Sequence, residues 1–223
     1  MTVSTTTTPD KSLENKSAPT RIYMFKRFER FWHWSQALLI MGMALTGFEI
    51  HGTYALFGFE DAVFYHTTSA WLLIGLWVFA IFWHLTTGEW RHYIPTMEKL
   101  VAVATFYSYG IFKGEHHPYK PTQLRKHNPL QLLAYLGFKL AMAPAIWITG
   151  LLYLYYNSWS AWGLGWLDLE IVALFHVAAA FALMIFLVGH VYLTTTGPTV
   201  FAHIKAMITG WDEHEAEESE NEK

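Results

Sequence analysis

The chain has 223 residues, of which 53% are hydrophobic and 17% aromatic, and its formal net charge is −3. This composition is too apolar for an ordinary soluble domain, and the chain is too short for a large transporter. It contains no cysteine, which excludes disulfides, Fe–S clusters bound by this chain and covalent attachment of haem.

The two ends of the chain differ in composition from its middle. Residues 1–20 are polar and rich in Thr and Ser, without the apolar stretch of a signal peptide. We expect a disordered cytoplasmic arm there. Residues 212–223 are acidic and are expected to form a disordered tail. Residues 21–211 are therefore predicted to form one membrane domain.

Four apolar windows are long enough to cross a bilayer as helices, which takes roughly 20 residues each. They are Phe31–Ile50, Ala62–Thr86, Leu130–Tyr155 and Leu169–Thr194. Two shorter apolar segments are too short to span. We expect Leu100–Ile111 to form an interfacial or re-entrant helix and Val200–Ile208 to lie along the cytoplasmic surface.

The basic residues predict the orientation of the bundle. No Lys or Arg occurs between Arg30 and Arg91, or between Lys139 and Lys205. The positive-inside rule then assigns both termini to the cytoplasm. The sequence therefore predicts an all-α fold, a bundle of four transmembrane helices with both termini cytoplasmic.

Two histidines lie on one face of the last predicted span. His176 and His190 are fourteen residues apart, which returns to within roughly 40° of the starting direction and separates the rings by roughly 21 Å along the helix. Polar side chains at membrane depth are costly and usually face a partner in the bundle interior. This helix thus offers two imidazoles at two membrane depths.

Matching the depths of the other histidines gives two predicted pairs. Because successive spans alternate in direction, His66 matches His176 at the outer depth. The inner partner of His190 is either His33 or His84, and the helical spacing does not distinguish them. Two imidazoles on opposing helices can hold a haem iron from both axial sides.

Other interpretations of the same histidines remain. A single membrane histidine more often makes only an interhelical hydrogen bond. A chain of them can relay protons in a small channel or transporter. A stand-alone membrane haem protein that reduces a soluble acceptor is a further alternative.

The chain resembles the membrane-integral cytochrome b subunits of formate dehydrogenase, thiosulfate reductase and nickel–iron hydrogenase complexes. The resemblance covers about residues 21–211. The stretches that carry it are Arg30–Trp34, Ala44–Gly47, Phe64–His66, His127–Gln131, Leu133–Tyr135, Thr149–Gly150, Leu174–Ala180, Gly189–Tyr192 and His203–Gly210. The run His84–Arg91 departs from the formate dehydrogenase pattern, so a separate role for His84 stays open.

This resemblance implies a dihaem cytochrome b in the bacterial inner membrane. An outer haem b would be bound by His66 and His176, and an inner haem b by His33 and His190. Quinone, either menaquinone or ubiquinone, would bind beside the inner haem near Asn128, with Gln131 as a second candidate. The loop around Asn128 is closer to the thiosulfate reductase form.

The expected function is electron transfer between an outer-face, periplasmic partner and the quinone pool. The outer connections carry no catalytic constellation, so substrate chemistry is expected on another polypeptide. Candidate partners are an Fe–S subunit with a molybdopterin or nickel–iron catalytic subunit, or a multihaem cytochrome c. Quinone redox chemistry is the only reaction expected in this chain, and no nucleic acid is expected as a partner.

Overall fold

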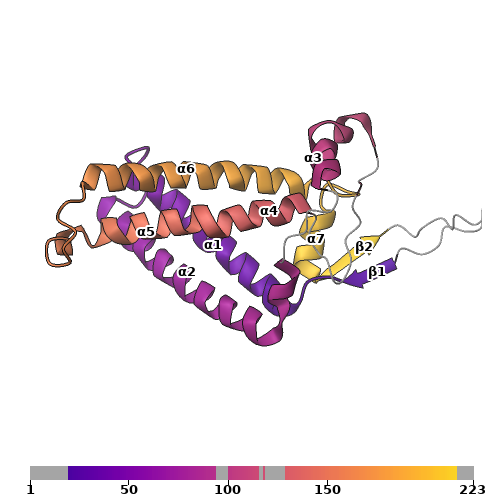
Figure 1. Ribbon diagram of the computed structural model, residues 1–223, viewed down its shortest axis with the longest axis horizontal. Helices are drawn as coiled ribbons and strands as arrows, with labels where there is room; N and C mark the ends of the chain where they lie inside the picture. Colours follow the sequence, from indigo (N-terminus) through magenta and orange to yellow (C-terminus); the bar gives the residue numbers. More distant parts are fainter. Residues whose placement is uncertain (1–19, 94–99, 116–117, 119–128, 215–223) are drawn as a thin grey trace, which may run out of the picture.

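The computed structural model describes residues 20–93, 100–115, 118 and 129–214, and it is mostly helical (Figure 1). The long helices are α1 (Arg27–Ile50), α2 (Phe59–Thr87) and α6 (Leu169–Thr194). A fourth runs without a break through α4 (Pro129–Gly137), a π-helical turn (Phe138–Met142) and α5 (Ala143–Leu154). Shorter helices are η2 (Glu89–Tyr93), α3 (Leu100–Ser108), η3 (Gly110–Lys113), η5 (Tyr156–Ser158) and α7 (Ala202–Thr209).

Three helices in the described part of the chain are long and apolar enough to cross a membrane. They are Phe59–Thr87, Leu132–Leu154 and Leu169–Thr194. Their large apolar side chains, such as Leu72, Phe82 and Ile185, are exposed, as expected for surfaces that lipid covers. The prediction of a helical membrane protein is thus confirmed. The fourth span stays a prediction, because α1 is not among these three helices. The cytoplasmic position of the termini also stays a prediction.

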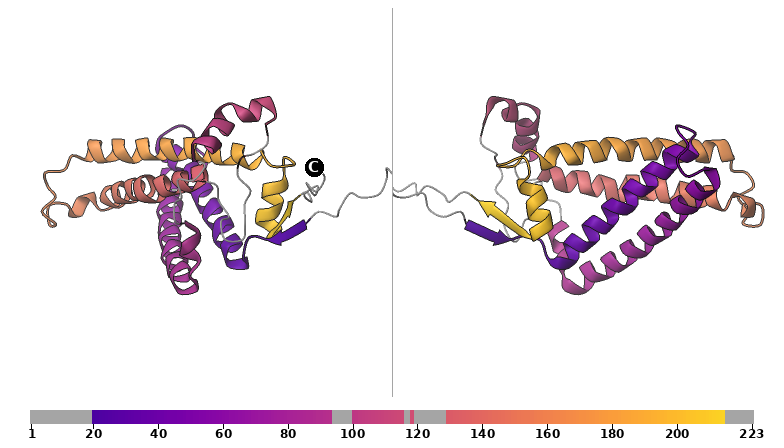
Figure 2. Two further views of the ribbon diagram at one scale, coloured as in Figure 1. Left: turned by 45° about the vertical axis from the view of Figure 1, so that its right-hand side comes forward. Right: turned by 180° about the vertical axis from the view of Figure 1, so that it is seen from behind.

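The long helices form two antiparallel hairpins. In one, α1 packs along α2, and in the other, α5 packs along α6 (Figures 1 and 2). Glu49 shapes the turn of the first hairpin, because its carboxylate accepts the backbone N–H groups of Leu56, Phe57 and Gly58 at 2.6, 2.8 and 2.8 Å. Gly58 has a φ of 91°, which favours glycine. This turn sets where α2 begins.

Aromatic side chains connect the two hairpins. Phe48 meets Phe181 with ring centroids 5.8 Å apart, and Trp77 meets Phe138 and Trp147 at 6.1 and 5.0 Å. The indole N–H of Trp77 also donates to Gln36 across its own hairpin at 2.7 Å. Large rings, rather than closely packed backbones, therefore separate the hairpins.

A two-stranded sheet joins the two ends of the described chain. Strand β1 (Thr20–Tyr23) pairs antiparallel with β2 (Trp211–His214), and Thr20 faces His214. These strands include Thr20 of the predicted N-terminal arm and residues 212–214 of the predicted acidic tail. Residues 1–19 and 215–223 lie outside the described part of the chain.

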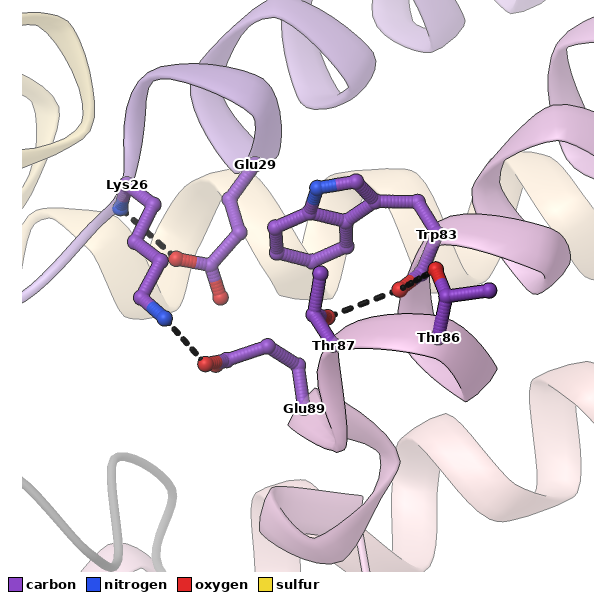
Figure 3. A network of polar contacts seen from close by, with 6 residues as sticks. All are labelled: Lys26, Glu29, Trp83, Thr86, Thr87 and Glu89. Carbon is purple, nitrogen blue, oxygen red and sulfur yellow. Dashed lines mark hydrogen bonds and ion pairs between the residues drawn. The ribbon is translucent and has the colours of Figure 1, made fainter.

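The start of α1 is held by α7 and by the segment after α2. Arg30 donates to the carbonyl of Ile208 at 2.5 Å, and Trp34 donates to that of Met207 at 3.2 Å. The side chain of Lys26 pairs with Glu89 of η2, and its backbone N–H donates to Glu29 at 2.7 Å (Figure 3). These contacts gather α1, η2 and α7 at the same end of the bundle (Figure 1).

Candidate functional site

His66 and His176 face each other from different hairpins. Each lies about two turns into its helix, His66 in α2 and His176 in α6. Their ring centroids are 6.3 Å apart, and the ring planes are inclined by 74°. The structure therefore brings together the two histidines that the sequence paired at the outer depth.

The Nδ1 atom of His66 faces two oxygen atoms of α1. It lies 3.1 Å from the carbonyl oxygen of Met43 and 3.2 Å from the hydroxyl oxygen of Thr46. That hydroxyl also lies 2.9 Å from the carbonyl oxygen of Gly42, one turn earlier, to which it donates. One short stretch of the neighbouring helix in the same hairpin thus supplies both polar contacts of this ring.

The second hairpin repeats this arrangement around His176. Its Nδ1 atom lies 3.2 Å from both the carbonyl oxygen of Ile146 and the hydroxyl oxygen of Thr149 in α5. The Thr149 hydroxyl donates in turn to the carbonyl of Ala145 at 2.6 Å. The same pattern of carbonyl, hydroxyl and ring therefore supports both outer histidines.

A glycine follows each of these threonines and faces the histidine ring. A Cβ atom added to Gly47 would lie 3.3 Å from Cε1 of His66, and one added to Gly150 would lie 3.0 Å from Cε1 of His176. Both distances are shorter than an ordinary carbon contact. Glycine at these positions lets the rings come close to the helix backbone.

His33 of α1 and His190 of α6 form a second pair. Their ring centroids are 6.1 Å apart with an interplanar angle of 48°. Phe186 stacks on His190 at 6.2 Å with nearly parallel planes, and Trp34 packs edge-on against His33 at 5.2 Å. Nδ1 of His33 is buried without a hydrogen-bond partner among the described residues.

His84 has different surroundings. Its Nδ1 atom lies 2.6 Å from the carbonyl oxygen of Ala80 in its own helix. Its ring packs edge-on against Trp32 and Trp83, with centroids 5.5 and 5.0 Å away. Of the two candidates that the sequence left open for the inner pair, His33 is the one whose ring the structure places next to His190.

The spacing within both pairs fits an iron porphyrin held between two imidazoles. A metal–nitrogen bond of about 2 Å, with about 1 Å from the ring nitrogen to the ring centre, separates two opposed imidazole centroids by about 6 Å. The observed values are 6.3 and 6.1 Å. Within the described residues, no three His, Cys, Asp or Glu side chains cluster as in a non-haem metal site.

The quinone candidates are not tested by the structure. Asn128 lies outside the described residues, and Gln131 lies in the first turn of α4, with its side chain undescribed. An apolar groove of about 580 Å³ runs beside this turn. Its walls are formed by Leu100, Val101, Ala104, Thr105, Ser108 and Tyr109 and by two residues of α4, Leu130 and Leu133.

Sequence reasoning missed the groups that support the outer histidines. Both Thr–Gly pairs contributed to the resemblance, but neither threonine had a role assigned. Thr46–Gly47 and Thr149–Gly150 each lie near the end of the helix that precedes a span with an outer histidine. This repeated dipeptide was the available signal.

Comparison with known proteins confirms the resemblance predicted from the sequence. Residues 24–210 match the family described as prokaryotic cytochrome b561. The chain is 32% identical over 204 residues to the putative cytochrome YdhU of Escherichia coli strain K12. The matched region covers 87% of this chain and 76% of that protein. No solved structure gives a significant match. The chain therefore belongs to the prokaryotic cytochrome b561 family of membrane electron-transfer proteins, whose members carry haem b.

Proposed function

We propose that this protein carries electrons across the bacterial inner membrane through two b haems, between a periplasmic redox partner and quinone at the cytoplasmic side. The observation that carries this proposal is the pair of facing histidines at each of two depths, with centroids 6.3 and 6.1 Å apart. The proposal places four spans in the membrane, including α1, and both termini in the cytoplasm.

His66 and His176 would bind the outer haem iron, and His33 and His190 the inner one. Haem b, when bound, supplies an iron that takes up and releases one electron at a time. With one imidazole supplied from each hairpin, neither site would leave an iron position open to oxygen. Each pair draws one histidine from each hairpin, so binding of haem would also join the two hairpins.

The separation of the two pairs supports transfer along the membrane normal. His176 and His190 lie on one helix face roughly 21 Å apart, so two haems held by these histidines would lie one above the other across the membrane. An electron that crosses between the outer and inner sites moves charge through the membrane potential, which is worth about 2.3 kcal/mol per 100 mV for a full crossing.

The quinone site is proposed near the start of α4. Asn128 and Gln131 would position the quinone ring, and the apolar groove between α3 and α4 is suited to an isoprenoid tail. Replacement of Asn128 by Ala should lower quinone turnover while both haems are retained. Unchanged turnover would remove this residue from the proposal.

A partner must supply the substrate chemistry. Exposed aromatic residues lie between α5 and α6, among them Tyr156, Trp162 and Trp166. We propose that a periplasmic Fe–S subunit, linked to a molybdopterin or nickel–iron catalytic subunit, or a multihaem cytochrome c docks at this end. Co-purification of such subunits would distinguish this role from that of a stand-alone haem reductase.

The deciding experiment is a dithionite-reduced minus oxidised spectrum with a pyridine haemochrome count on the purified chain. We expect two b haems per chain. One haem would contradict the two-site proposal. A colourless protein, expressed with ample haem, would favour the alternative of a proton channel or transporter.

A further inference from the structure

The support of the outer histidines is built twice, from the same parts in the same order. In each hairpin a backbone carbonyl, a threonine three residues later and the following glycine surround one imidazole. Met43, Thr46 and Gly47 do so for His66. The α5 counterparts are Ile146, Thr149 and Gly150. Two independent copies indicate that the arrangement serves the histidines rather than local helix packing.

The hydrogen bonds determine which nitrogen of each ring carries the proton. A backbone carbonyl can only accept. The hydroxyl hydrogen of Thr46 is directed to the carbonyl of Gly42 at 2.9 Å, and that of Thr149 to the carbonyl of Ala145 at 2.6 Å. Both hydroxyl oxygens can therefore only accept from the rings. Nδ1 must be the protonated nitrogen, and the lone pair of Nε2 is left for a metal.

We propose that Thr46 and Thr149 are positioning residues that hold the outer histidines in this tautomer and lower the reduction potential of the outer haem. This inference rests on the proposed function. An Nδ1–H that donates to two oxygens makes Nε2 a more basic ligand. A more basic axial ligand favours the ferric over the ferrous iron, so the midpoint potential falls.

The inner pair provides the comparison within the same molecule. Nδ1 of His33 has no hydrogen-bond partner in the part of the chain that the structure describes. Aromatic rings, those of Trp34 and Phe186, pack against the two inner imidazoles. Substitution of Thr46 or Thr149 should therefore shift the reduction potential of the outer haem alone.

The test is a redox titration of the purified dihaem protein, with Thr46→Val, Thr149→Val and the double variant. Valine keeps the shape of threonine and removes the acceptor. The titration should show one redox wave for the outer haem (the outer wave) and one for the inner haem (the inner wave). We expect the midpoint potential of the outer wave to become more positive in each single variant and more so in the double variant. The inner wave should not shift. Thr46→Ser and Thr149→Ser, which keep the hydroxyl, should restore the wild-type potential.

The outer wave is assigned with His176→Ala, which should remove it. Electron paramagnetic resonance of the oxidised protein gives a second readout, since the g-values of the outer haem should change in the valine variants and return in the serine variants. An outer wave that does not move in the double variant, with both haems present, would overturn the inference and leave the proposed function intact. Fewer than two haems in the wild-type protein would instead refute the proposed function.

Discussion

Replacement of Gly150 by Ala should weaken the outer haem site selectively. The new Cβ would lie 3.0 Å from Cε1 and 3.4 Å from Nδ1 of His176, whereas carbon atoms normally pack at about 3.5–4.0 Å. The ring must therefore retreat by a few tenths of an ångström. Its Nδ1 contacts to Ile146 and Thr149 are already 3.2 Å long, so such a shift would lengthen and weaken both.

The cost follows from the loss of this support. Disrupting the groups that orient a metal-bound histidine typically lowers metal affinity about 10- to 100-fold, or about 1.4–2.8 kcal/mol. The helix itself should not suffer, because alanine is favoured over glycine in a helix by about 1 kcal/mol. We therefore expect a folded Gly150→Ala protein with an incompletely filled outer site.

The assay is a pyridine haemochrome count per chain after expression with limiting haem, together with a redox titration. Gly150→Ala should give between one and two haems and a diminished outer wave. Gly47→Ala should act in the same direction but less, because its added Cβ would lie 3.3 Å from His66. Gly137→Ala in α4, whose added Cβ would have no neighbour within 4 Å, is the matched control. Two full haems with unchanged potentials in Gly150→Ala would refute the reasoning.

Three further predictions concern other residues. His176→Ala should reduce the haem count from two to one, whereas His84→Ala should keep two; loss of a haem in His84→Ala would contradict the inner pairing. Because the rings of His66 and His176 are inclined by 74°, the outer ferric haem should give a strongly anisotropic low-spin resonance, and a nearly isotropic pattern would count against this geometry. Lys26→Met should destabilise the fold by about 1 kcal/mol through loss of the pair with Glu89, measured by thermal unfolding in detergent. That pair raises the pKa of Lys26 above its usual 10.5. Between neutral pH and this value the difference from wild type should therefore be constant, and it should shrink at higher pH as Lys26 loses its proton. A difference that persists in strong alkali would exclude the ion pair as its cause.

The long helices could be predicted from the sequence because apolar length is a local property. The bounds of α6 agree with the predicted span Leu169–Thr194, and the fourteen-residue spacing of His176 and His190 needs only helical geometry. The inner partner of His190 could not be predicted in this way. Depth along a helix is readable from a sequence, but the direction that His33 and His84 face depends on how α1 and α2 rotate against each other.

The contacts that support the outer histidines were largely hidden for a physical reason. The carbonyl groups of Met43 and Ile146 are backbone atoms, so their residue types carry no sign of the interaction. Only the threonine and glycine of each copy leave a trace in the sequence. Likewise, β1 and β2 are four residues each and pair across nearly the whole chain, so neither has a local signal strong enough to predict a strand.

The two histidine pairs differ in the contacts that orient their rings. His66 and His176 are each oriented by contacts with the other helix of their own hairpin. The relative position of His33 and His190 depends on α1 and α6, which belong to different hairpins.

The start of α1 is also attached to the segment that follows α6. Arg30 and Trp34 on either side of His33 donate to the last turn of α7, which follows α6 in the chain. The backbone N–H groups of Met24 and Phe25 donate to the carbonyl of Gly210 at 2.8 and 3.2 Å, where a side chain would clash. These hydrogen bonds link the helix turn that carries His33 to the segment that follows the helix of His190, at the same end of the bundle. The outer histidines are thus oriented by contacts within each hairpin. The helix turn that carries the inner His33 is instead held by contacts with α7.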